Sequence, residues 1–299
     1  MKILSFGSMN IDNTYSVDEF VQPGETMTAK NLSKFCGGKG LNQSIALASA
    51  GADVAHFGCV GEDGDILLDM LKSRGVNTDS VIKIDNITSG HAIIQVDSHG
   101  QNSILLYPGA NRRMTPELID RELEKYSCGD WLLIQNETNC LEYIMRAANK
   151  KGMKIAFNPS PMDGTVSTLP LELVDLFLVN EIEGAAVTGK ESTEEITAEF
   201  EKLFPNAAVI LTLGKKGSIF KSEKDMLFQP SYCGTVKDTT GAGDTYTGFF
   251  IANYIKGVSP QECMRIAAMA STVQISSDGA AIAIPTKQEV LNALKNHCR

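Results

Sequence analysis

The sequence lacks the cysteine pairs and the long apolar runs that mark several classes of protein. No two cysteines form a C-x-x-C pair and their number is odd, which argues against both a zinc site and a disulfide framework. No apolar stretch approaches the roughly 18 residues of a membrane-spanning helix, and the run at residues 2–7 is too short for a signal peptide. These absences predict a cytoplasmic protein in a reducing compartment. The seven cysteines are Cys36, Cys59, Cys128, Cys140, Cys233, Cys263 and Cys298.

The sequence also lacks an excess of positive charge, low-complexity tracts and internal repeats. Its formal net charge of −9 and pI of about 5.0 oppose a nucleic-acid partner, because nucleic-acid-binding proteins usually present a basic face. With 43% hydrophobic and 21% charged residues, the chain has a globular composition. Its 299 residues suffice for one large α/β domain with an appendage or for two smaller domains. We therefore expect small-molecule ligands and neither nucleic acid nor membrane as a partner.

Short β-rich runs alternate with helical patterns through the second half of the chain. After strand patterns at residues 2–7 and 54–60, four such runs follow, separated by helical segments that include 141–150 and 193–203. This alternation is typical of an α/β fold with a doubly wound, mostly parallel sheet flanked by helices. Several strands end in polar or turn residues, so their carboxyl ends are expected to line one crevice. The four runs are 131–135, 154–157, 176–179 and 209–213.

One region breaks this alternation. Residues 91–96 and 103–107 are strand patterns joined by a short polar turn, which predicts a hairpin and hence a small antiparallel β lid. Both arms carry consecutive apolar residues, a pattern that implies a sheet covered on both faces. Because a small lid would leave one face in water, we infer that a second subunit covers it, which makes the protein a homodimer.

The stretch from Val236 to Gly248 carries the strongest signal of chemistry. Gly241 and Gly243 precede a helix expected at residues 249–255, and glycine backbone next to a helix N-terminus favours an anion. Asp244 would repel that anion unless the chemistry needs a base that removes a proton from an attacking hydroxyl. On this stretch alone an alternative stays open, in which Asp244 caps the helix and the glycines form a plain turn.

A second glycine-rich stretch, residues 37–43, leads into a helix expected at 44–50 and offers Lys39 and Asn42 as polar side chains. Asn10 and Asp12 follow the first strand, where open α/β sheets bind ligands, although both residue types also favour turns. Residues 184–190 copy the spacing of a phosphate-binding P-loop, but Glu191 replaces the magnesium-binding Ser or Thr, so a short helix ending at Gly189 is expected there instead.

Five motifs, in this order and spacing, resemble the ribokinase-like family of carbohydrate kinases over essentially the whole chain. They lie at residues 7–12, 37–43, 180–183, 212–217 and 238–244. The resemblance implies one kinase domain over residues 1–299, with a lid formed by strands within about 10–36 and 88–108. It also implies ATP-dependent phosphorylation of D-ribose at its 5-hydroxyl, giving ribose 5-phosphate.

Two other functions compete with ribose phosphorylation. Another small sugar or a nucleoside could be the acceptor, because the shape of the pocket, not the loop motif, selects it. A catalytically inactive sugar-binding regulator belongs to a different class, and Asp244 argues against it, since a binding protein has no need of a carboxylate facing a phosphate.

The family resemblance assigns roles to matching residues. Gly241, Ala242 and Gly243 would stabilise the charge that develops during transfer, and Asp244 would be the base. The sugar would be bound by Asn10, Asp12, Gly38, Lys39, Asn42 and Glu137, together with Asp244. ATP would contact Asn180, Thr212, Gly214, Gly217 and Gly243, and Glu183 would organise Mg²⁺ through water. A potassium ion would lie at Asp238, Thr240, Gln274, Ser277 and Gly279.

Two positions depart from the family's pattern. Ala283 stands where a serine often helps to ligate the monovalent cation, and alanine has no such oxygen. Ala268 stands near the expected adenine, where relatives often carry a larger polar residue. The resemblance implies activation by potassium, with sodium a poor substitute, at a site that lacks the serine oxygen, and the preferred nucleobase stays open.

Overall fold

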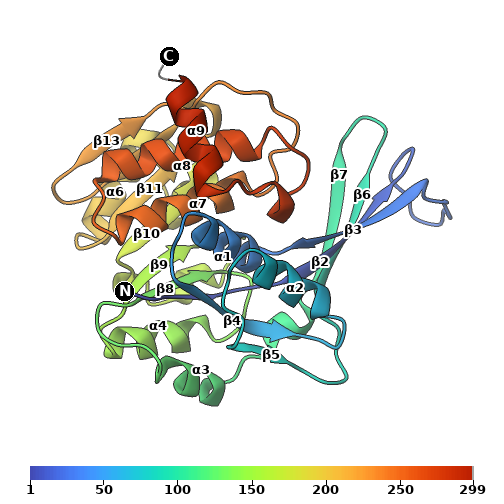
Figure 1. Cartoon of the computed structure of the whole chain (residues 1–299), viewed down its shortest axis with the longest axis horizontal. Coiled ribbons are helices and arrows are strands. Elements are labelled where there is room, and N and C mark those ends of the chain that lie inside the picture. The colour runs from blue at the N-terminus through green and yellow to red at the C-terminus, as the bar shows by residue number, and fades with distance from the viewer. Residues whose placement is uncertain (298–299) are drawn as a thin grey trace.

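The structure, a computed structural model, describes residues 1–297, so Cys298 lies outside the described residues. Within this range nine strands form a large sheet in the order β13-β12-β11-β10-β9-β8-β1-β4-β5, and helices cover both of its faces (Figure 1). The strands are β1 (Ile3–Phe6), β4 (Val54–Val60), β5 (Val81–Lys83), β8 (Trp131–Gln135), β9 (Lys154–Asn158), β10 (Leu176–Asn180), β11 (Ala208–Thr212), β12 (Ser218–Lys221) and β13 (Met226–Gln229). All neighbouring pairs are parallel except β11–β12 and β12–β13.

The helices form two layers because successive strand residues point to opposite faces of the sheet. Leu133 belongs to the core cluster that includes residues of α1, α7, α8 and α9, whereas its neighbours Leu132 and Ile134 belong to the cluster on the other face, which includes residues of α3, α4 and α6. The helices are α1 (Lys39–Ser49), α2 (Asp65–Ser73), α3 (Pro116–Leu123), α4 (Leu141–Lys150), α5 (Glu181–Thr188), α6 (Thr193–Leu203), α7 (Ala242–Tyr254), α8 (Pro260–Gln274) and α9 (Lys287–His297). The predicted doubly wound, mostly parallel α/β fold is confirmed.

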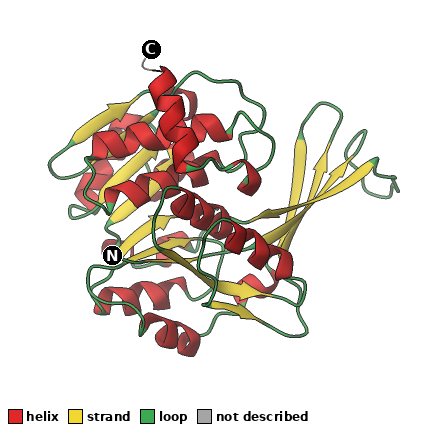
Figure 2. Cartoon of the chain, viewed as in Figure 1, coloured by secondary structure: helices red, strands yellow, loops and turns green. Residues whose placement is uncertain are grey.

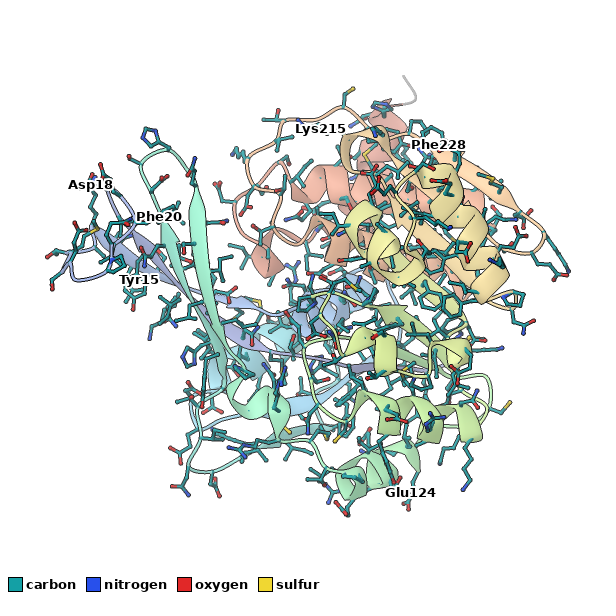
Figure 3. All side chains as sticks on the ribbon, turned by 180° about the vertical axis from the view of Figure 1, so that it is seen from behind. Tyr15, Asp18, Phe20, Glu124, Lys215 and Phe228 are labelled. Atoms are coloured by element: carbon teal, nitrogen blue, oxygen red, sulfur yellow. The ribbon has the colours of Figure 1, made fainter. Side chains whose placement is uncertain are left out.

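A smaller sheet projects from this body as an arm (Figures 1 and 2). It has the order β3-β2-β6-β7, with β2–β3 and β6–β7 antiparallel and β2–β6 parallel. Its strands are β2 (Asn10–Ser16), β3 (Asn31–Gly37), β6 (Gly90–Val96) and β7 (Asn102–Tyr107). Tyr15, Asp18 and Phe20 lie toward the far end of the arm (Figure 3). The hairpin pattern predicted cover on both faces of this sheet, yet every residue of β7 is exposed in the single chain.

One alternative is excluded and one local prediction was wrong. Asn10 and Asp12 follow β1, as predicted, but they belong to β2, which continues the chain into the small sheet, so the alternative of a turn is excluded. Helix α7 begins at Ala242 and not at Phe249. The residues between these positions are small or polar and lack the apolar periodicity that predicts a helix, although all from Asp244 onward are buried.

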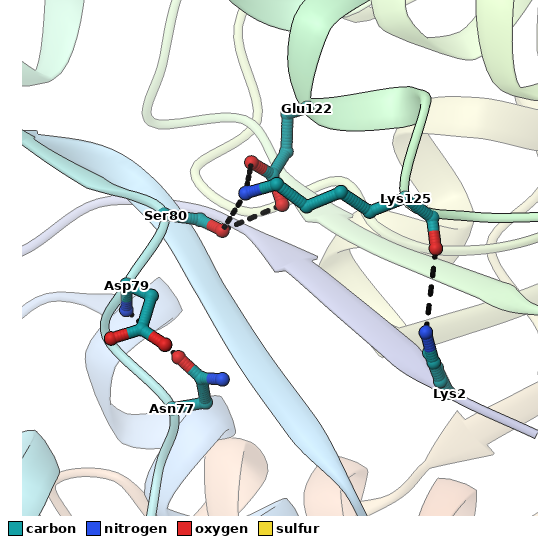
Figure 4. Close-up of polar contacts among 6 residues, drawn as sticks. All are labelled: Lys2, Asn77, Asp79, Ser80, Glu122 and Lys125. Carbon is teal, nitrogen blue, oxygen red and sulfur yellow. Dashed lines mark hydrogen bonds and ion pairs between the residues drawn. The ribbon is translucent and has the colours of Figure 1, made fainter.

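A polar cluster under α3 fixes the edge of the large sheet that lies away from the glycine-rich stretches. The buried carboxylate of Glu122 accepts hydrogen bonds from the Ser80 hydroxyl at 2.6 Å and from Lys125 Nζ at 2.6 Å (Figure 4). Lys2 Nζ donates to the Lys125 carbonyl oxygen at 3.4 Å. Burial of a charged group is costly unless it is paired, and this pairing joins α3 to the segment before β5.

Among the described residues no helix is long and apolar enough to cross a membrane.

Candidate active site

The two glycine-rich stretches meet at the carboxyl end of β1. A Cβ on Gly40 would lie 2.5 Å from the Gly7 backbone, and a Cβ on Gly7 would lie 2.2 Å from Gln135 Oε1. No real side chain tolerates such contacts, so the glycines let α1 approach the ends of β1 and β8 closely. This approach brings the polar first turn of α1 against the start of α7, with which α1 packs closely along its length.

Asp244 is the third residue of α7, and Gly241, in a left-handed conformation, is the N-cap residue. The N-cap position therefore belongs to Gly241, which has no side chain, and not to Asp244. Its buried carboxylate instead accepts hydrogen bonds from Asn42 Nδ2 at 3.1 Å and from Gln43 Nε2 at 2.9 Å. The capping alternative therefore fails, and the carboxylate is held by α1 in one orientation.

Gln43 is itself fixed by residues from the centre of the sheet. Its Oε1 accepts a hydrogen bond from Gln135 Nε2 at 2.7 Å, and its Nε2 also donates to Asn158 Oδ1 at 3.2 Å. Asn158 Nδ2 donates to the Leu178 carbonyl oxygen at 2.7 Å. Gln43 and Gln135 are fully buried. This chain of amides ties the carboxylate of Asp244 to the carboxyl ends of β8, β9 and β10 and so restricts its position, although Gln135 Oε1 and Asn42 Oδ1 are buried without a hydrogen-bond partner.

The glycine-rich loop before α7 opens into a cavity of about 230 Å³, which Asp244 also lines. Gly241 is packed, since a Cβ there would lie 3.1 Å from Ala280 Cβ. Gly243 is different, because a Cβ there would meet nothing within 4 Å and its backbone is ordinary helix. Packing therefore does not require glycine at position 243. Its bare backbone N–H in the first turn of a helix is the kind of donor that binds phosphate.

Lys39 is the cation of the site and lines the same cavity. Burial lowers its pKa, but the carboxylates of Asp244, Glu137 and Glu183 raise it more, so the pKa lies above the usual value. Lys39 is therefore protonated at neutral pH, and its charge lies among three carboxylates from α7, the end of β8 and α5. A charge in this place can attract a phosphate group that would otherwise face only negative side chains.

On the other side of Lys39 lie the residues predicted to bind the sugar. Glu137 Oε2 accepts hydrogen bonds from the Ser8 hydroxyl and from the Lys39 backbone N–H, the latter at 3.1 Å. Asn10 Oδ1 accepts from Asn111 Nδ2 at 2.8 Å, which leaves the Asn10 amide nitrogen as a donor. Gly38 packs against the backbone of Ser8, Met9 and Asn10. The carboxylates, the amide and the backbone groups here form a set of acceptors and donors suited to a polyol.

Asp12 lies beside Gly37, where a Cβ would come within 2.1 Å of Asp12 Oδ2. Burial, and secondarily the negative charge of Glu137, raise the pKa of Asp12 to about 6. A carboxyl group whose pKa is raised in the folded state stabilises the fold below its unfolded pKa of about 3.8, and this stabilisation is lost as the pH rises through about 6. At neutral pH the ionised carboxylate of Asp12 therefore destabilises the protein in the absence of a ligand.

We expect Asp12→Asn to raise the melting temperature at pH 7.5, with a gain of at most about 3 kcal/mol from the loss of this cost, and to raise KM for the sugar. The gain should vanish as the pH falls toward 4. Thermal unfolding from pH 4 to pH 8 measures it. Asp130→Asn is the matched control, and it should lower the melting temperature at pH 7.5. Burial raises the pKa of Asp130, but the N–H groups of Lys2 and Ser127 outweigh burial and lower it. A less stable Asp12→Asn protein at pH 7.5 would contradict this account.

The residues predicted to contact the nucleotide divide into two groups. Asn180, Glu183 and Thr212 line the cavity of the glycine-rich loop. Gly214 and Gly217 do not line it and form the turn between β11 and β12, where a Cβ on Gly217 would lie 2.1 Å from the Gln229 carbonyl oxygen.

A capping box holds Glu183 at the start of α5. Asn180 Oδ1 accepts from the Glu183 N–H at 2.8 Å, and Glu183 Oε2 accepts from the Asn180 N–H at 3.0 Å. The described residues give Glu183 Oε1 no hydrogen bond. The residues present fit magnesium, because this ion is usually bound by one or two carboxylates, water and the phosphates of its substrate. Within residues 1–297 no group of three or more acidic, histidine or cysteine side chains could hold a metal ion.

The residues predicted to bind potassium also converge, in the loop before α7 and after α8. Asp238 Oδ1 accepts from the Thr240 N–H at 2.8 Å and Oδ2 accepts from the Gly279 N–H at 3.0 Å. Burial raises the pKa of Asp238, but these bonds and the Thr240 hydroxyl outweigh burial and lower it. The Ser277 N–H donates to the Gln274 carbonyl oxygen at 3.2 Å. The Gln274 side chain, however, lies between the carbonyl oxygens that an ion would need, so the donor set does not fit a potassium ion.

Sequence reasoning missed the supporting residues Gln43, Gln135, Asn158 and Asn111. Gln43 carried a signal, because it follows Asn42 in the glycine-rich motif and is a polar residue in a mainly apolar helix. Asn111 carried none. It lies in a short turn after the small sheet, about 100 residues from the Asn10 amide that it orients. Ala268, which was expected near the adenine, lies on α8 in the core cluster that also includes residues of α1 and α7.

Comparison with known proteins agrees with this geometry. Residues 1–287 match the family model described as pfkB family carbohydrate kinase. The chain is 33% identical to a ribokinase of Haemophilus influenzae over 298 residues, 97% of each chain. It is 29% identical over 298 residues to a deoxyribokinase of Salmonella typhi, again 97% of each chain. A solved structure of Arabidopsis thaliana ribokinase complexed with ribose and ATP superimposes with a TM-score of 0.86, at 29% identity and covering 98% of both chains.

Proposed function

Because this chain belongs to the pfkB family of carbohydrate kinases and is an ATP-dependent sugar kinase, we propose that it phosphorylates D-ribose at the 5-hydroxyl. The observation that carries the proposal is the placement of Asp244. Its carboxylate is buried, is held by Asn42 and Gln43, and lies in the first turn of α7 beside a glycine-rich loop that faces a cavity.

In the proposed mechanism Asp244 acts as a general base. The carboxylate accepts the proton of the 5-hydroxyl as the hydroxyl oxygen attacks the γ-phosphorus of ATP, and ADP leaves. Asp244 is the third residue of α7 and so lies next to the N–H groups that would bind the phosphate. One helix turn therefore carries both the base and the groups that stabilise the phosphate. Most of the rate enhancement in phosphoryl transfer comes from such positioning and from stabilisation of charge.

The negative charge on the phosphate would be stabilised by the N–H groups of Gly241, Ala242 and Gly243 and by the ammonium group of Lys39. Glu183, oriented by Asn180, would hold magnesium through water, and the ion would neutralise negative charge on the phosphates. Thr212, Gly214 and Gly217 are proposed contacts of ATP. The ribose hydroxyls are assigned to Asn10, Asp12, Gly38, Lys39, Asn42 and Glu137. A sugar lacking one hydroxyl would leave a buried polar group unpaired, which disfavours it as an acceptor.

An acceptor screen tests the proposal. Release of ADP is measured with purified protein, magnesium-ATP and a panel of pentoses, 2-deoxyribose, hexoses and nucleosides. We expect the highest kcat/KM with D-ribose and a product that carries its phosphate on C5. A higher kcat/KM with 2-deoxyribose or a nucleoside would show that this compound, and not D-ribose, is the acceptor. No ADP release with any sugar or nucleoside would support the sugar-binding regulator instead.

The exposed edge of the small sheet supports a homodimer. Strand register places Phe35, Asp12, Ala92 and Leu106 in one row across the sheet, on the same face. We call this face, with Ile104, the Asp12 face. Leu106 is 45% and Ile104 58% exposed, and β7 is an unpaired edge strand. Contiguous exposed apolar side chains on a sheet favour association, and a partner on this face would lie over the residue that we assign to the sugar.

We therefore expect Leu106→Glu to dissociate the dimer and to raise KM for the sugar, because a charge would be buried without a partner. Leu105→Glu is the matched control, since Leu105 is the adjacent residue and points to the opposite face. Sedimentation velocity at micromolar concentration measures the difference. A parent protein that is monomeric and fully active when dilute would contradict the dimer, and dissociation by both substitutions would contradict the choice of face.

We also propose a cytoplasmic location. The six cysteines within the described residues are free thiols, and free thiols suit a reducing compartment.

A further inference from the structure

The side chain of Gln274 lies in the place where the loop before α7 would hold a monovalent cation. Gln274 is the last residue of α8 and is fully buried. Its Nε2 donates hydrogen bonds to the carbonyl oxygen of Thr240 at 2.7 Å and to that of Gly279 at 3.2 Å. One nitrogen thus joins the loop that precedes the glycines to the segment that follows α8.

These contacts reproduce what a bound ion would do. A monovalent cation in a protein is coordinated by carbonyl oxygens that replace its hydration shell. The amide nitrogen of Gln274 presents two N–H groups with partial positive charge to two such oxygens, at ordinary hydrogen-bond distances. Both carbonyl oxygens are therefore satisfied by the chain itself, and the nitrogen fills the space between them.

The opposite orientation of the amide is unfavourable unless an ion is present. It would turn Gln274 Oε1 toward the two carbonyl oxygens and bring three acceptors together. In the observed orientation Oε1 has no hydrogen-bond partner. One unpaired buried acceptor is a smaller penalty than three acceptors facing one another, so the amide keeps its nitrogen inward.

The Asp238 carboxylate is also engaged, and Ala283 supplies no ligand. Both carboxylate oxygens of Asp238 accept backbone N–H groups, from Thr240 and Gly279. Ala283 has no side-chain oxygen. The loop from Asp238 to Gly241 is thus fixed at three points by Asp238 and Gln274. Gly241 in turn packs on Ala280 and is the N-cap residue of α7.

We propose that the Gln274 amide takes the place of a monovalent cation in this chain, so that the kinase needs no potassium. Gln274 is a positioning residue: it holds the Thr240 carbonyl group and, through the following residues, the N–H groups of Gly241 to Gly243. The inference rests on the proposed role of those N–H groups in binding phosphate.

Activity at fixed ionic strength in potassium, sodium and tetramethylammonium chloride tests this assignment. We expect the parent protein to work at the same rate, within about twofold, in all three salts. Gln274→Ala should lose about tenfold in kcat in tetramethylammonium, the effect of one lost hydrogen-bonding group, and potassium should restore most of it. Gln274→Glu, of nearly the same shape, should also depend on potassium, because its carboxylate needs a cation between it and the two carbonyl oxygens. Gln288→Ala, which truncates an exposed glutamine on α9, is the control.

Thermal unfolding provides a readout that does not depend on the acceptor. A cation that binds only the folded protein raises the melting temperature, so potassium should stabilise Gln274→Ala and Gln274→Glu but not the parent. If D-ribose proved not to be the acceptor, the effect of potassium on these melting temperatures would be unchanged. Activation or stabilisation of the parent by potassium would overturn the inference, because the amide would then turn its oxygen to a bound ion. A Gln274→Ala protein as active as the parent in tetramethylammonium would also overturn it.

Discussion

Replacing Asp244 with Asn is expected to lower kcat by roughly 10²–10⁴, the usual contribution of a general base, and to leave the affinity for ATP nearly unchanged. The substitution keeps the shape of the side chain but removes the group that accepts the proton. It should not disturb the fold. Asn42 Oδ1 is buried without a hydrogen-bond partner, so the Asn42 amide can rotate and accept a hydrogen bond from the new amide nitrogen.

Steady-state kinetics, nucleotide binding and thermal unfolding of the Asp244→Asn protein measure this separation. Asp65→Asn is the control, because Asp65 is likewise an aspartate in the first turn of a helix but lies on the exposed surface of α2. It should lose at most a small amount of stability and no activity. An Asp244→Asn protein that turns over as fast as the parent would show that the carboxylate has only a structural role.

Replacing Gly243 with Ala should change activity and stability in opposite directions. A methyl group at this position meets no protein atom within 4 Å, so alanine fits the folded chain. Alanine is favoured over glycine within helices by about 0.5–1 kcal/mol, and the protein should therefore become slightly more stable. The same methyl group would project where the phosphate must approach the N–H groups, and kcat/KM for ATP should fall by roughly 10²-fold, the loss caused by removing one such donor.

Gly164→Ala is the matched control for this prediction. Gly164 and Gly243 are the two described glycines whose added Cβ would meet nothing within 4 Å and whose φ is not positive. The first lies in an exposed loop before a short turn, and the second faces the cavity. Gly164→Ala should leave kcat/KM unchanged. Equal activity of the Gly243→Ala and parent proteins would exclude phosphate binding at the start of α7.

The central part of the fold could be predicted from the sequence because its signals are local. The strand at Trp131–Gln135 and the helix at Leu141–Lys150 are contiguous and begin and end at residues read directly from their patterns. The apolar run at 249–255 predicted only the later part of α7, which begins at Ala242. Glycine and threonine at its beginning have low helix propensity, and the close packing of α7 on α1 and α8 overrides that preference. Asp12 lies in β2, an inner strand of the small sheet, within the range 10–36 in which the resemblance implied lid strands.

The site was predictable only as far as its motifs are contiguous. Asp244, Lys39 and Asn42 lie in glycine-rich stretches, and the structure brings the three together. The hydrogen bonds that hold Asp244 cross about 200 residues, and the bond from Gln135 to Gln43 crosses 92. No spacing rule encodes such contacts. Gln274 shows the same limit, because only the fold reveals that its amide lies against the Thr240 carbonyl group, 34 residues earlier.

A crystal structure of the complex with D-ribose and a non-hydrolysable ATP analogue tests the central claim most directly. We expect the 5-hydroxyl oxygen of ribose at about 2.6–3.2 Å from a carboxylate oxygen of Asp244, the reach that proton transfer needs. The γ-phosphate should lie over the N–H groups of Gly241 to Gly243, in line with that hydroxyl. A complex in which another side chain contacts the 5-hydroxyl, or in which the γ-phosphate lies away from the start of α7, would contradict this account.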